Sequence, residues 1–268
     1  MIGSIIGDIV GSSYELMNTN KKDFNLYRKI SRFTDDTVLT IATADCLLRE
    51  GNFKDFYRTH TLKYPLRGYG SKFLVWAYFN KKNPNYSFGN GGAMRVAPIA
   101  YISNDLYTVL EITEKSCIAT HNHPEGIKGA KAIAACIYLA RQNCSKEEIK
   151  QYIENEYKYN LNISVEEFHS KYRSNATCQN SIPQAIVAFL ESTDFESCLR
   201  NAIYIGGDSD TVACMACGIA EAYYKEIPYD IFEFCFRKLN NNQKSIIKDF
   251  YNKYIISSTI TNKINDLL

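Results

Sequence analysis

Two short acidic clusters are the residues of this sequence best suited to chemistry. The first is Thr34-Asp35-Asp36-Thr37 and the second is Asp208-Ser209-Asp210-Thr211, and each places two carboxylates beside hydroxyl groups. Oxygen donors gathered in this way are typical ligands of Mg²⁺, Mn²⁺ or Ca²⁺. Helix capping uses one oxygen at a helix end, so the second carboxylate of each cluster is surplus. Adjacent carboxylates repel unless a cation or a proton lies between them. If the fold joins the clusters, the sequence predicts a site for two divalent ions.

A glycine-rich segment is the next candidate for ligand contact. It reads Ser87-Phe88-Gly89-Asn90-Gly91-Gly92-Ala93-Met94-Arg95 and is predicted to be a loop that runs into a helix. Backbone N–H groups of such loops can hold phosphate groups. The segment lacks the Lys-Ser/Thr pair of a Walker A loop and no predicted strand precedes it, which argues against an NTPase. Phe88 could stack on a nucleobase or serve as a core residue in a turn between helices, and the local sequence leaves both open.

His121 is a candidate for contact with a ligand. It lies in Thr120-His121-Asn122-His123-Pro124-Glu125-Gly126, where Pro124 and Gly126 interrupt the helix that would align a zinc site. We therefore expect His121 to contact a substrate or to order its loop.

Glu15 is a candidate for acid or base chemistry. It follows Asp8 by seven residues, which is two helical turns, so both side chains are predicted to project from one face of the first helix. Gly7 and Gly11 are expected to keep the surface of that helix open beside them.

The elements that must position these residues are predicted to be helices. Apolar residues recur at helical spacing along the chain, whereas long alternating strand patterns are missing. Capping boxes at Ser145–Glu148 and Ser164–Glu167 mark two helix starts, and an amphipathic segment at roughly 242–253 is expected to be the final helix. The polar segment 143–180 is expected to form peripheral helices and loops. We predict an all-α fold of roughly ten or more helices in a single compact domain, residues 1–268, since no Pro/Gly/Ser-rich linker divides the sequence.

The composition is that of an ordinary globular protein. Hydrophobic residues make up 46% of the 268 positions, and 31 Lys and Arg stand against 29 Asp and Glu. The resulting net charge of +2 excludes the concentrated basic surface of a dedicated nucleic-acid-binding protein. Nine cysteines in no regular framework indicate reduced thiols, and Cys214-Met215-Ala216-Cys217 is expected to pack in the core. No secretory or transmembrane pattern is recognised, so we expect a cytoplasmic protein without membrane contact that acts as a monomer.

Five motifs, taken together, resemble the ADP-ribosylglycohydrolase family, typified by the dinitrogenase reductase-activating glycohydrolase. They occur in the family's order over about residues 1–224, and the set is specific although each motif alone is weak. The motifs are Gly3–Glu15, Phe33–Thr37, Gly89–Arg95, Thr120–Gly126 and Gly206–Thr211. The Gly-x-x-Tyr-Glu ending of the first motif is similar to the branch that removes ADP-ribose from serine and cleaves related O-linked ADP-ribose. Many members have Ser where Thr34 stands, which keeps the hydroxyl.

The resemblance implies an all-α orthogonal bundle with a central cleft that holds two Mg²⁺ or Mn²⁺ ions. The implied metal ligands are Thr34, Asp35, Asp36, Asp208, Asp210 and Thr211. Glu15 would match the acidic residue implicated in catalysis, and Asp35 and Asp36 would share the catalytic centre. The implied substrate contacts, with the glycine loop around the pyrophosphate and Phe88 near the adenosine, are Ser87, Phe88, Gly89, Asn90, Gly91, Gly92 and His121.

The implied activity is metal-dependent hydrolysis of the glycosidic bond between ADP-ribose and an acceptor. The acceptor would be a protein side chain or another O- or N-linked conjugate, so the reaction would reverse ADP-ribosylation. Such a bond breaks through a transition state of oxocarbenium character. A metal-bound water would be the nucleophile, and Glu15 would protonate the leaving oxygen or orient the water.

Three other functions compete with this one. The main alternative is a non-catalytic ADP-ribose-binding protein of regulatory or immunity type, in which loss of the acidic clusters is expected, whereas this chain keeps them. A two-metal phosphohydrolase of all-α fold usually pairs histidines with aspartate, and the only close histidine pair here is remote in sequence from both acidic clusters. A purely structural helical bundle leaves the surplus carboxylates unexplained.

Overall fold

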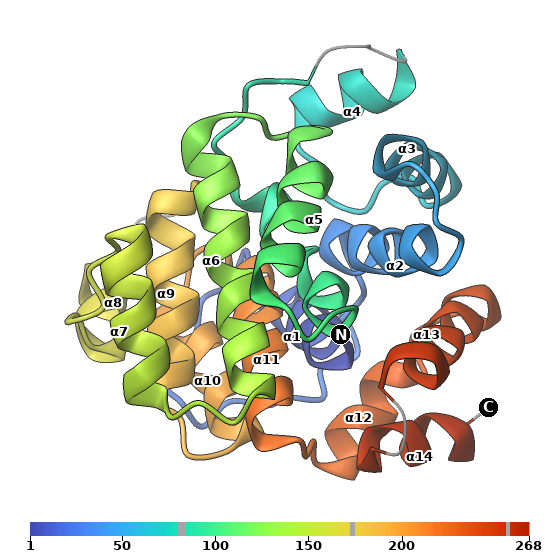
Figure 1. Cartoon of the computed structure of the whole chain (residues 1–268). Helices are drawn as coiled ribbons and strands as arrows, with labels where there is room; N and C mark the ends of the chain where they lie inside the picture. The colour runs from blue at the N-terminus through green and yellow to red at the C-terminus, as the bar shows by residue number, and fades with distance from the viewer. Residues whose placement is uncertain (80–83, 172–174, 256–257, 268) are drawn as a thin grey trace.

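The chain is helical throughout the part that the structure describes (Figure 1). The computed structural model describes residues 1–79, 84–171, 175–255 and 258–267. Its α-helices are α1 (Ile2–Gly11), α2 (Asp35–Leu48), α3 (Phe53–Lys63), α4 (Ser71–Tyr78), α5 (Leu106–Ile118), α6 (Pro124–Arg141), α7 (Lys146–Tyr157), α8 (Val165–Ser170), α9 (Cys178–Leu190), α10 (Phe195–Ile205), α11 (Ser209–Tyr224), α12 (Tyr229–Phe236), α13 (Asn241–Tyr254) and α14 (Thr259–Asp266). There are also two 3-10 helices, η1 (Asn90–Gly92) within the glycine loop and η2 (Ala97–Tyr101) after it. Within these ranges the only strand-like pairing is an antiparallel bridge between Gly89 and Thr177, so the all-α prediction is confirmed.

The centre of the bundle is the contact between α1 and α11, which lie side by side in Figure 1. Gly3, Gly7 and Gly11 recur every fourth residue and form one ridge of α1. A Cβ added at Gly7 would lie 2.1 Å from the carbonyl oxygen of Ala213, and one at Gly11 would lie 2.6 Å from the Cα of Asp210. The backbones therefore touch along this ridge. The expectation that Gly7 and Gly11 leave an open surface is wrong, because α11 occupies it.

The other helices pack around this pair. α2, α6, α9 and α10 contact α1 or α11, α13 packs against α2, and α7 and α8 lie at the edge of the bundle (Figure 1). The buried apolar side chains form one continuous core. Cys214 and Cys217 are buried in it, as expected for small residues of α11. No helix in the described ranges is both long enough and apolar enough to span a bilayer.

Three local predictions differ from the structure. α1 ends at Gly11, because the hydroxyls of Ser12 and Ser13 donate to the carbonyls of Ile9 and Val10 and compete with another helical turn. Glu15 consequently lies in the turn that follows and does not share a helix face with Asp8. The glycine loop runs into 3-10 turns where a longer helix was expected. The helix that was expected to be the last is α13, but α14 follows it. In contrast, both predicted capping boxes are present.

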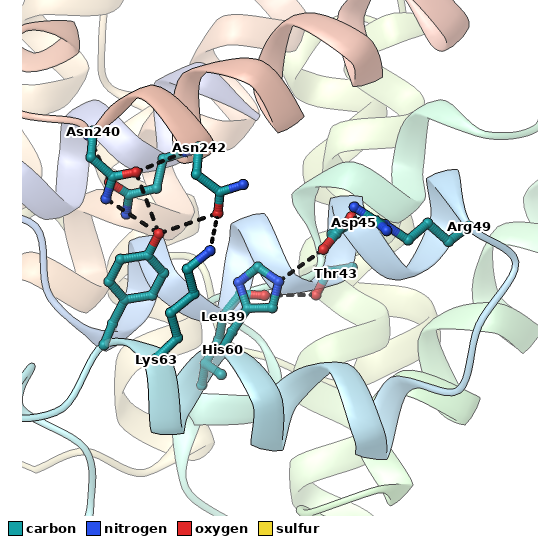
Figure 2. Close-up of polar contacts among 10 residues, drawn as sticks. Leu39, Thr43, Asp45, Arg49, His60, Lys63, Asn240 and Asn242 are labelled. Carbon is teal, nitrogen blue, oxygen red and sulfur yellow. Dashed lines mark hydrogen bonds and ion pairs between the residues drawn. The ribbon is translucent and has the colours of Figure 1, made fainter.

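A buried carboxylate joins α2 to α3 on the side of the bundle that faces α13 (Figure 2). Asp45 Oδ1 accepts from Arg49 Nε at 2.7 Å and Asp45 Oδ2 lies 3.0 Å from His60 Nε2. His60 is 4% exposed, although its surrounding sequence is polar. Burial works to raise the pKa of Asp45, yet the hydrogen bonds from His60 and Arg49 hold that pKa below its usual range. The ionised carboxylate therefore stabilises the fold.

We expect Gly7→Ala to destabilise the protein although alanine is the better helix former. Helix propensity alone would add about 1 kcal/mol of stability. The new methyl group meets the backbone of α11, which cannot give way as a side chain can, so we expect a net loss of at least about 2 kcal/mol. Urea unfolding measures the difference. Gly70→Ala is the matched control, because in the described part of the chain no heavy atom lies within 4 Å of an added Cβ there. A Gly7→Ala protein as stable as the wild type would contradict the close contact between α1 and α11.

We expect Asp45→Asn to lower stability by about 1–3 kcal/mol at pH 7, since it leaves His60 and Arg49 without their anion. A depressed carboxyl pKa contributes stability that is present above the unfolded value, about 3.9, and is lost as the pH falls through the folded value. The gap between wild type and variant should therefore narrow below about pH 4. Urea unfolding from pH 3 to 7 tests this, with the exposed Asp55→Asn as control. A gap that is independent of pH would mean that the charge of Asp45 stabilises nothing.

Candidate active site

The two acidic clusters meet where three helices converge. Thr34 is the N-cap of α2 and Asp208 is the N-cap of α11, so both clusters lie at helix starts. Asp8 comes from α1, between two of the glycines that contact α11. Carboxylate oxygens of Asp8, Asp36 and Asp210 lie within 4.8 Å of one another, and so do those of Glu15, Asp208 and Asp210. Asp210 belongs to both groups, which makes the two groups one continuous acidic centre.

Asp8 fixes the start of α2 against α1. Its Oδ1 accepts from Thr34 Oγ1 at 2.6 Å, and its Oδ2 accepts from the backbone N–H groups of Thr34 at 2.9 Å and Thr37 at 3.1 Å and from the Thr37 hydroxyl. A carboxylate at this place neutralises the N-terminal end of the α2 dipole. Burial raises the pKa of Asp8 to about 6 despite these four hydrogen bonds.

The remaining carboxylates of the centre are held close together at an electrostatic cost. Burial, followed by the charges of neighbouring carboxylates, raises the pKa of Asp35, Asp36 and Asp210 well above the usual range. Asp36 Oδ2 accepts from Thr211 Oγ1 at 3.3 Å, whereas its buried Oδ1 has no hydrogen-bond partner among the described residues. Buried oxygen atoms without a partner, in a set of hard donors, fit a divalent cation. The acidic centre could therefore hold metal.

Glu15 reaches the acidic centre from an exposed turn. Its carboxylate groups with Asp208 and Asp210, although the residue itself is open to solvent. Burial of the carboxyl, and then the charge of Asp208, raises the pKa of Glu15, while Arg32 opposes the rise. A carboxyl group with a raised pKa at the mouth of a cleft is suited to proton transfer.

The glycine loop also lines the cleft and is tied directly to the acidic centre. Asn90 is buried, and its side-chain amide donates to Asp208 Oδ2 and to Ser181 Oγ at 3.0 Å. The loop is held from behind by the segment before α9, since Asn90 N donates to the carbonyl oxygen of Ala176 at 3.0 Å and Cys178 N donates to that of Phe88 at 3.0 Å. The cleft has a volume of about 440 Å³, within the range of small-molecule sites.

His121 packs against the glycine loop with a buried, neutral ring. Burial, and then the charge of Arg95, lowers the pKa of His121 to about 3. Thr120 Oγ1 accepts from Arg95 Nη2 at 2.7 Å and lies within hydrogen-bond distance, 2.7 Å, of His121 Nδ1. A Cβ added at Gly91 would lie 3.0 Å from His121 Nε2. Gly91 therefore has to be glycine for the loop to lie over this ring.

Comparison with known proteins identifies the family. A model of the ADP-ribosylglycohydrolase family matches residues 1–254.

The chain belongs to the ADP-ribosylglycohydrolase family.

Relatives of this glycohydrolase carry related names. ADP-ribosylhydrolase ARH3 of Homo sapiens is 28% identical over 312 residues, covering 84% of this chain and 84% of the relative. ADP-ribosylarginine hydrolase Tri1 of Pseudomonas putida (strain GB-1) is 23% identical over 84% of this chain and 69% of its own length. A solved structure described as an ADP-ribosylglycohydrolase-related protein complex superposes with a TM-score of 0.70 at 21% identity, covering 94% and 95% of the two chains, and shares the fold. As a member of the family, the chain is a hydrolase of the glycosidic bond to ADP-ribose.

The structure brings most of the predicted site residues of the glycohydrolase to one cleft. Its lining includes Glu15, Thr34, Asp35, Asp36, Ser87, Gly89, Asn90, Gly91, His121, Asp208, Asp210 and Thr211. Gly92 lies beneath this surface, where an added Cβ would be 2.7 Å from Cys117 Sγ. Phe88 is 46% exposed and lies outside the lining, edge-on to His123 with 5.4 Å between ring centroids.

Sequence reasoning missed two buried polar residues of the glycohydrolase site. Asp8 was noted only as a companion of Glu15, yet it belongs to the acidic centre. Its position between glycines spaced four apart was the available signal, because such a ridge marks a close helix contact. Arg95 ends the glycine motif and is fully buried, with its guanidinium 3.9 Å from the centroid of the Tyr57 ring. Nothing in the local sequence distinguishes it from a surface arginine.

We expect Asn90→Ala to weaken divalent-cation binding by the glycohydrolase about ten- to a hundredfold, because residues that orient a metal ligand commonly have effects of this size. The change removes the amide that holds Asp208 and leaves every carboxylate in place. Calorimetry with Mg²⁺ and with Mn²⁺ measures the affinity in the absence of substrate. Asn85→Ala, at a cleft asparagine that donates instead to the carbonyl oxygen of Lys72, is the control. Equal affinities in both variants and the wild type would contradict the link between the loop and the acidic centre.

Proposed function

We propose that this glycohydrolase uses two divalent ions, Mg²⁺ or Mn²⁺, to hydrolyse ADP-ribose from an O-linked acceptor such as serine. The observation that supports it most directly is the acidic centre beside a glycine loop in one cleft of about 440 Å³. The first-motif ending at Glu15 resembles the serine branch, and relatives named ADP-ribosylhydrolase ARH3 align over most of the chain.

The residues present fit the metal ions of this proposal. The carboxyl groups of Asp35, Asp36 and Asp210 carry raised pKa values because they are buried together, and Asp36 Oδ1 lacks a partner among the described residues. The two ions would be held by Thr34, Asp35, Asp36, Asp208, Asp210 and Thr211. Bound there, they would anchor the ribose hydroxyls and activate a water molecule. Asp8 supports this set from behind, since its oxygens are occupied by the start of α2.

The glycine loop and the acidic centre would bind different parts of ADP-ribose and so orient it in the cleft. Backbone N–H groups of the segment from Ser87 to Gly92 would hold the pyrophosphate, as glycine loops do. His121 would support the loop from below through the contact of its ring with Gly91. Phe88, on the rim, would stack on the adenine, which its partial exposure allows. This arrangement would leave the distal ribose at the acidic centre.

Glu15 would move the proton of the reaction. Its carboxyl group lies beside Asp208 and Asp210, and burial together with the charge of Asp208 raises its pKa. It would donate a proton to the leaving oxygen of the acceptor, or accept one from the attacking water, as the glycosidic bond breaks. Its place on an exposed turn leaves room for a bulky acceptor at the mouth of the cleft.

The test is release of ADP-ribose from serine-, arginine- and nucleotide-linked substrates, with and without EDTA. We expect release from the serine-linked substrate and its loss in EDTA. Glu15→Gln should keep ADP-ribose affinity and lower kcat about 10²- to 10⁴-fold, the usual contribution of a general acid or base. Glu156→Gln, on the exposed surface of α7, is the control. Release that is insensitive to EDTA would overturn the role of metal, and near wild-type kcat in Glu15→Gln would overturn the role of Glu15.

A further inference from the structure

A second cavity lies next to the glycine loop, outside the catalytic cleft. Its volume is about 660 Å³, larger than that of the cleft and large enough for a nucleotide. We call it the lysine groove and define it by Lys128, Lys158, Tyr159, Phe168, Lys171 and Gln179. These residues come from α6, the segment just after α7, the C-terminal part of α8 with the residue after it, and the first turn of α9. The described lining residues of the groove and of the cleft do not overlap.

The lysine groove is positively charged. Three lysines line it, and none of its described lining residues is acidic. Lys128 Nζ is paired with Glu125 at 2.8 Å, whereas Lys171 Nζ and Glu167 form only a loose pair at 3.9 Å. Lys158 is exposed and has no ion-pair partner in the described ranges. Two ammonium groups are therefore available to an anion, and ammonium groups commonly bind phosphate.

The walls of the groove also offer partners for a base. Tyr159 is 6% exposed, and its buried hydroxyl has no hydrogen-bond partner among the described residues. Pro183, inside α9, has no N–H to give to the carbonyl of Gln179, so that carbonyl lacks its helical donor. The side-chain amide of Gln179 adds donors and an acceptor of the kind that read the edges of bases. Phe168 supplies an aromatic face.

The groove adjoins the catalytic cleft at one short segment of the chain. Asn175 lines the groove and Ala176, the next residue, lines the cleft. The carbonyl oxygen of Ala176 accepts the hydrogen bond from Asn90 N that holds the glycine loop. A ligand in the groove would therefore touch the same segment that supports the loop.

We propose that the lysine groove is a second binding site, for a nucleotide. The ammonium groups of Lys158 and Lys171 bind its phosphate, and the aromatic and amide side chains bind its base. The nucleotide is either free in solution or a unit of a substrate that also occupies the cleft. The proposal does not depend on the reaction assigned to the cleft.

The first test is calorimetric titration of AMP into the full chain without ADP-ribose, so that AMP has access to both the cleft and the lysine groove. We expect two binding sites, one of which is weakened about tenfold in Lys158→Glu/Lys171→Glu because two favourable charges are reversed. Lys248→Glu/Lys253→Glu, on α13 and away from the groove in Figure 1, makes the same change of net charge and should leave AMP affinity unchanged.

The second test compares an ADP-ribosylated oligonucleotide with an ADP-ribosylated peptide as substrates of both double variants. A higher KM for the oligonucleotide alone, in the groove variant alone, supports the site and makes the nucleotide part of the substrate. Loss of AMP affinity with both KM values unchanged supports the site and makes the nucleotide a free ligand. Unchanged AMP binding together with unchanged KM values overturns the proposal, and so does an equal effect of the α13 variant.

Discussion

At Gly7, α1 approaches α11 so closely that a methyl group would stand 2.1 Å from a backbone carbonyl oxygen, and the polar part of the cleft depends on that approach. Side chains normally keep helix axes apart, and only glycine permits backbone contact along a ridge. The contact places Asp8, in the middle of α1, beside Asp210 at the start of α11. The start of α2 then follows, because its N-terminal donors bind the Asp8 carboxylate. The relative positions of α1, α2 and α11 are thus set by the glycine contact between α1 and α11 and by the buried Asp8 carboxylate.

The same arrangement concentrates charge that the fold itself does not neutralise. Helix starts attract carboxylates, and hydroxyl donors satisfy some of the oxygens. These contributions do not offset burial, since the pKa of Asp36 and that of Asp210 remain raised. Structural cores avoid such clusters, because each buried like charge costs free energy until a counter-ion joins it. The acidic centre therefore lowers the stability of the folded chain as long as no counter-ion joins it, a cost common at functional sites.

The parts of this molecule that could be predicted from sequence are those set by local chemistry. The capping boxes at Ser145 and Ser164 and the surplus carboxylates follow from residue type and spacing. The length of α1 could not be predicted in this way. The hydroxyls of Ser12 and Ser13 compete with the backbone after Gly11, so α1 ends there and Glu15 lies outside the helix. The burial of His60 depends on a carboxylate fifteen positions away on another helix, and the lysine groove depends on segments distant in sequence. Such features arise from tertiary packing, which a periodic pattern does not encode.

Arg95 is a buried positive charge that acts on one side of the cleft. Its guanidinium lies wholly inside the protein, against the Tyr57 ring and the Thr120 hydroxyl, and no carboxylate in the described ranges pairs with it. The field of a buried charge is weakly screened, so it extends through His121 toward the glycine loop. Asn90 of the same loop binds Asp208 of the acidic centre. The loop therefore lies in the fields of a buried cation and of several carboxylates, so an anionic group of a guest is favoured on the side nearer Arg95 and a neutral group beside the carboxylates.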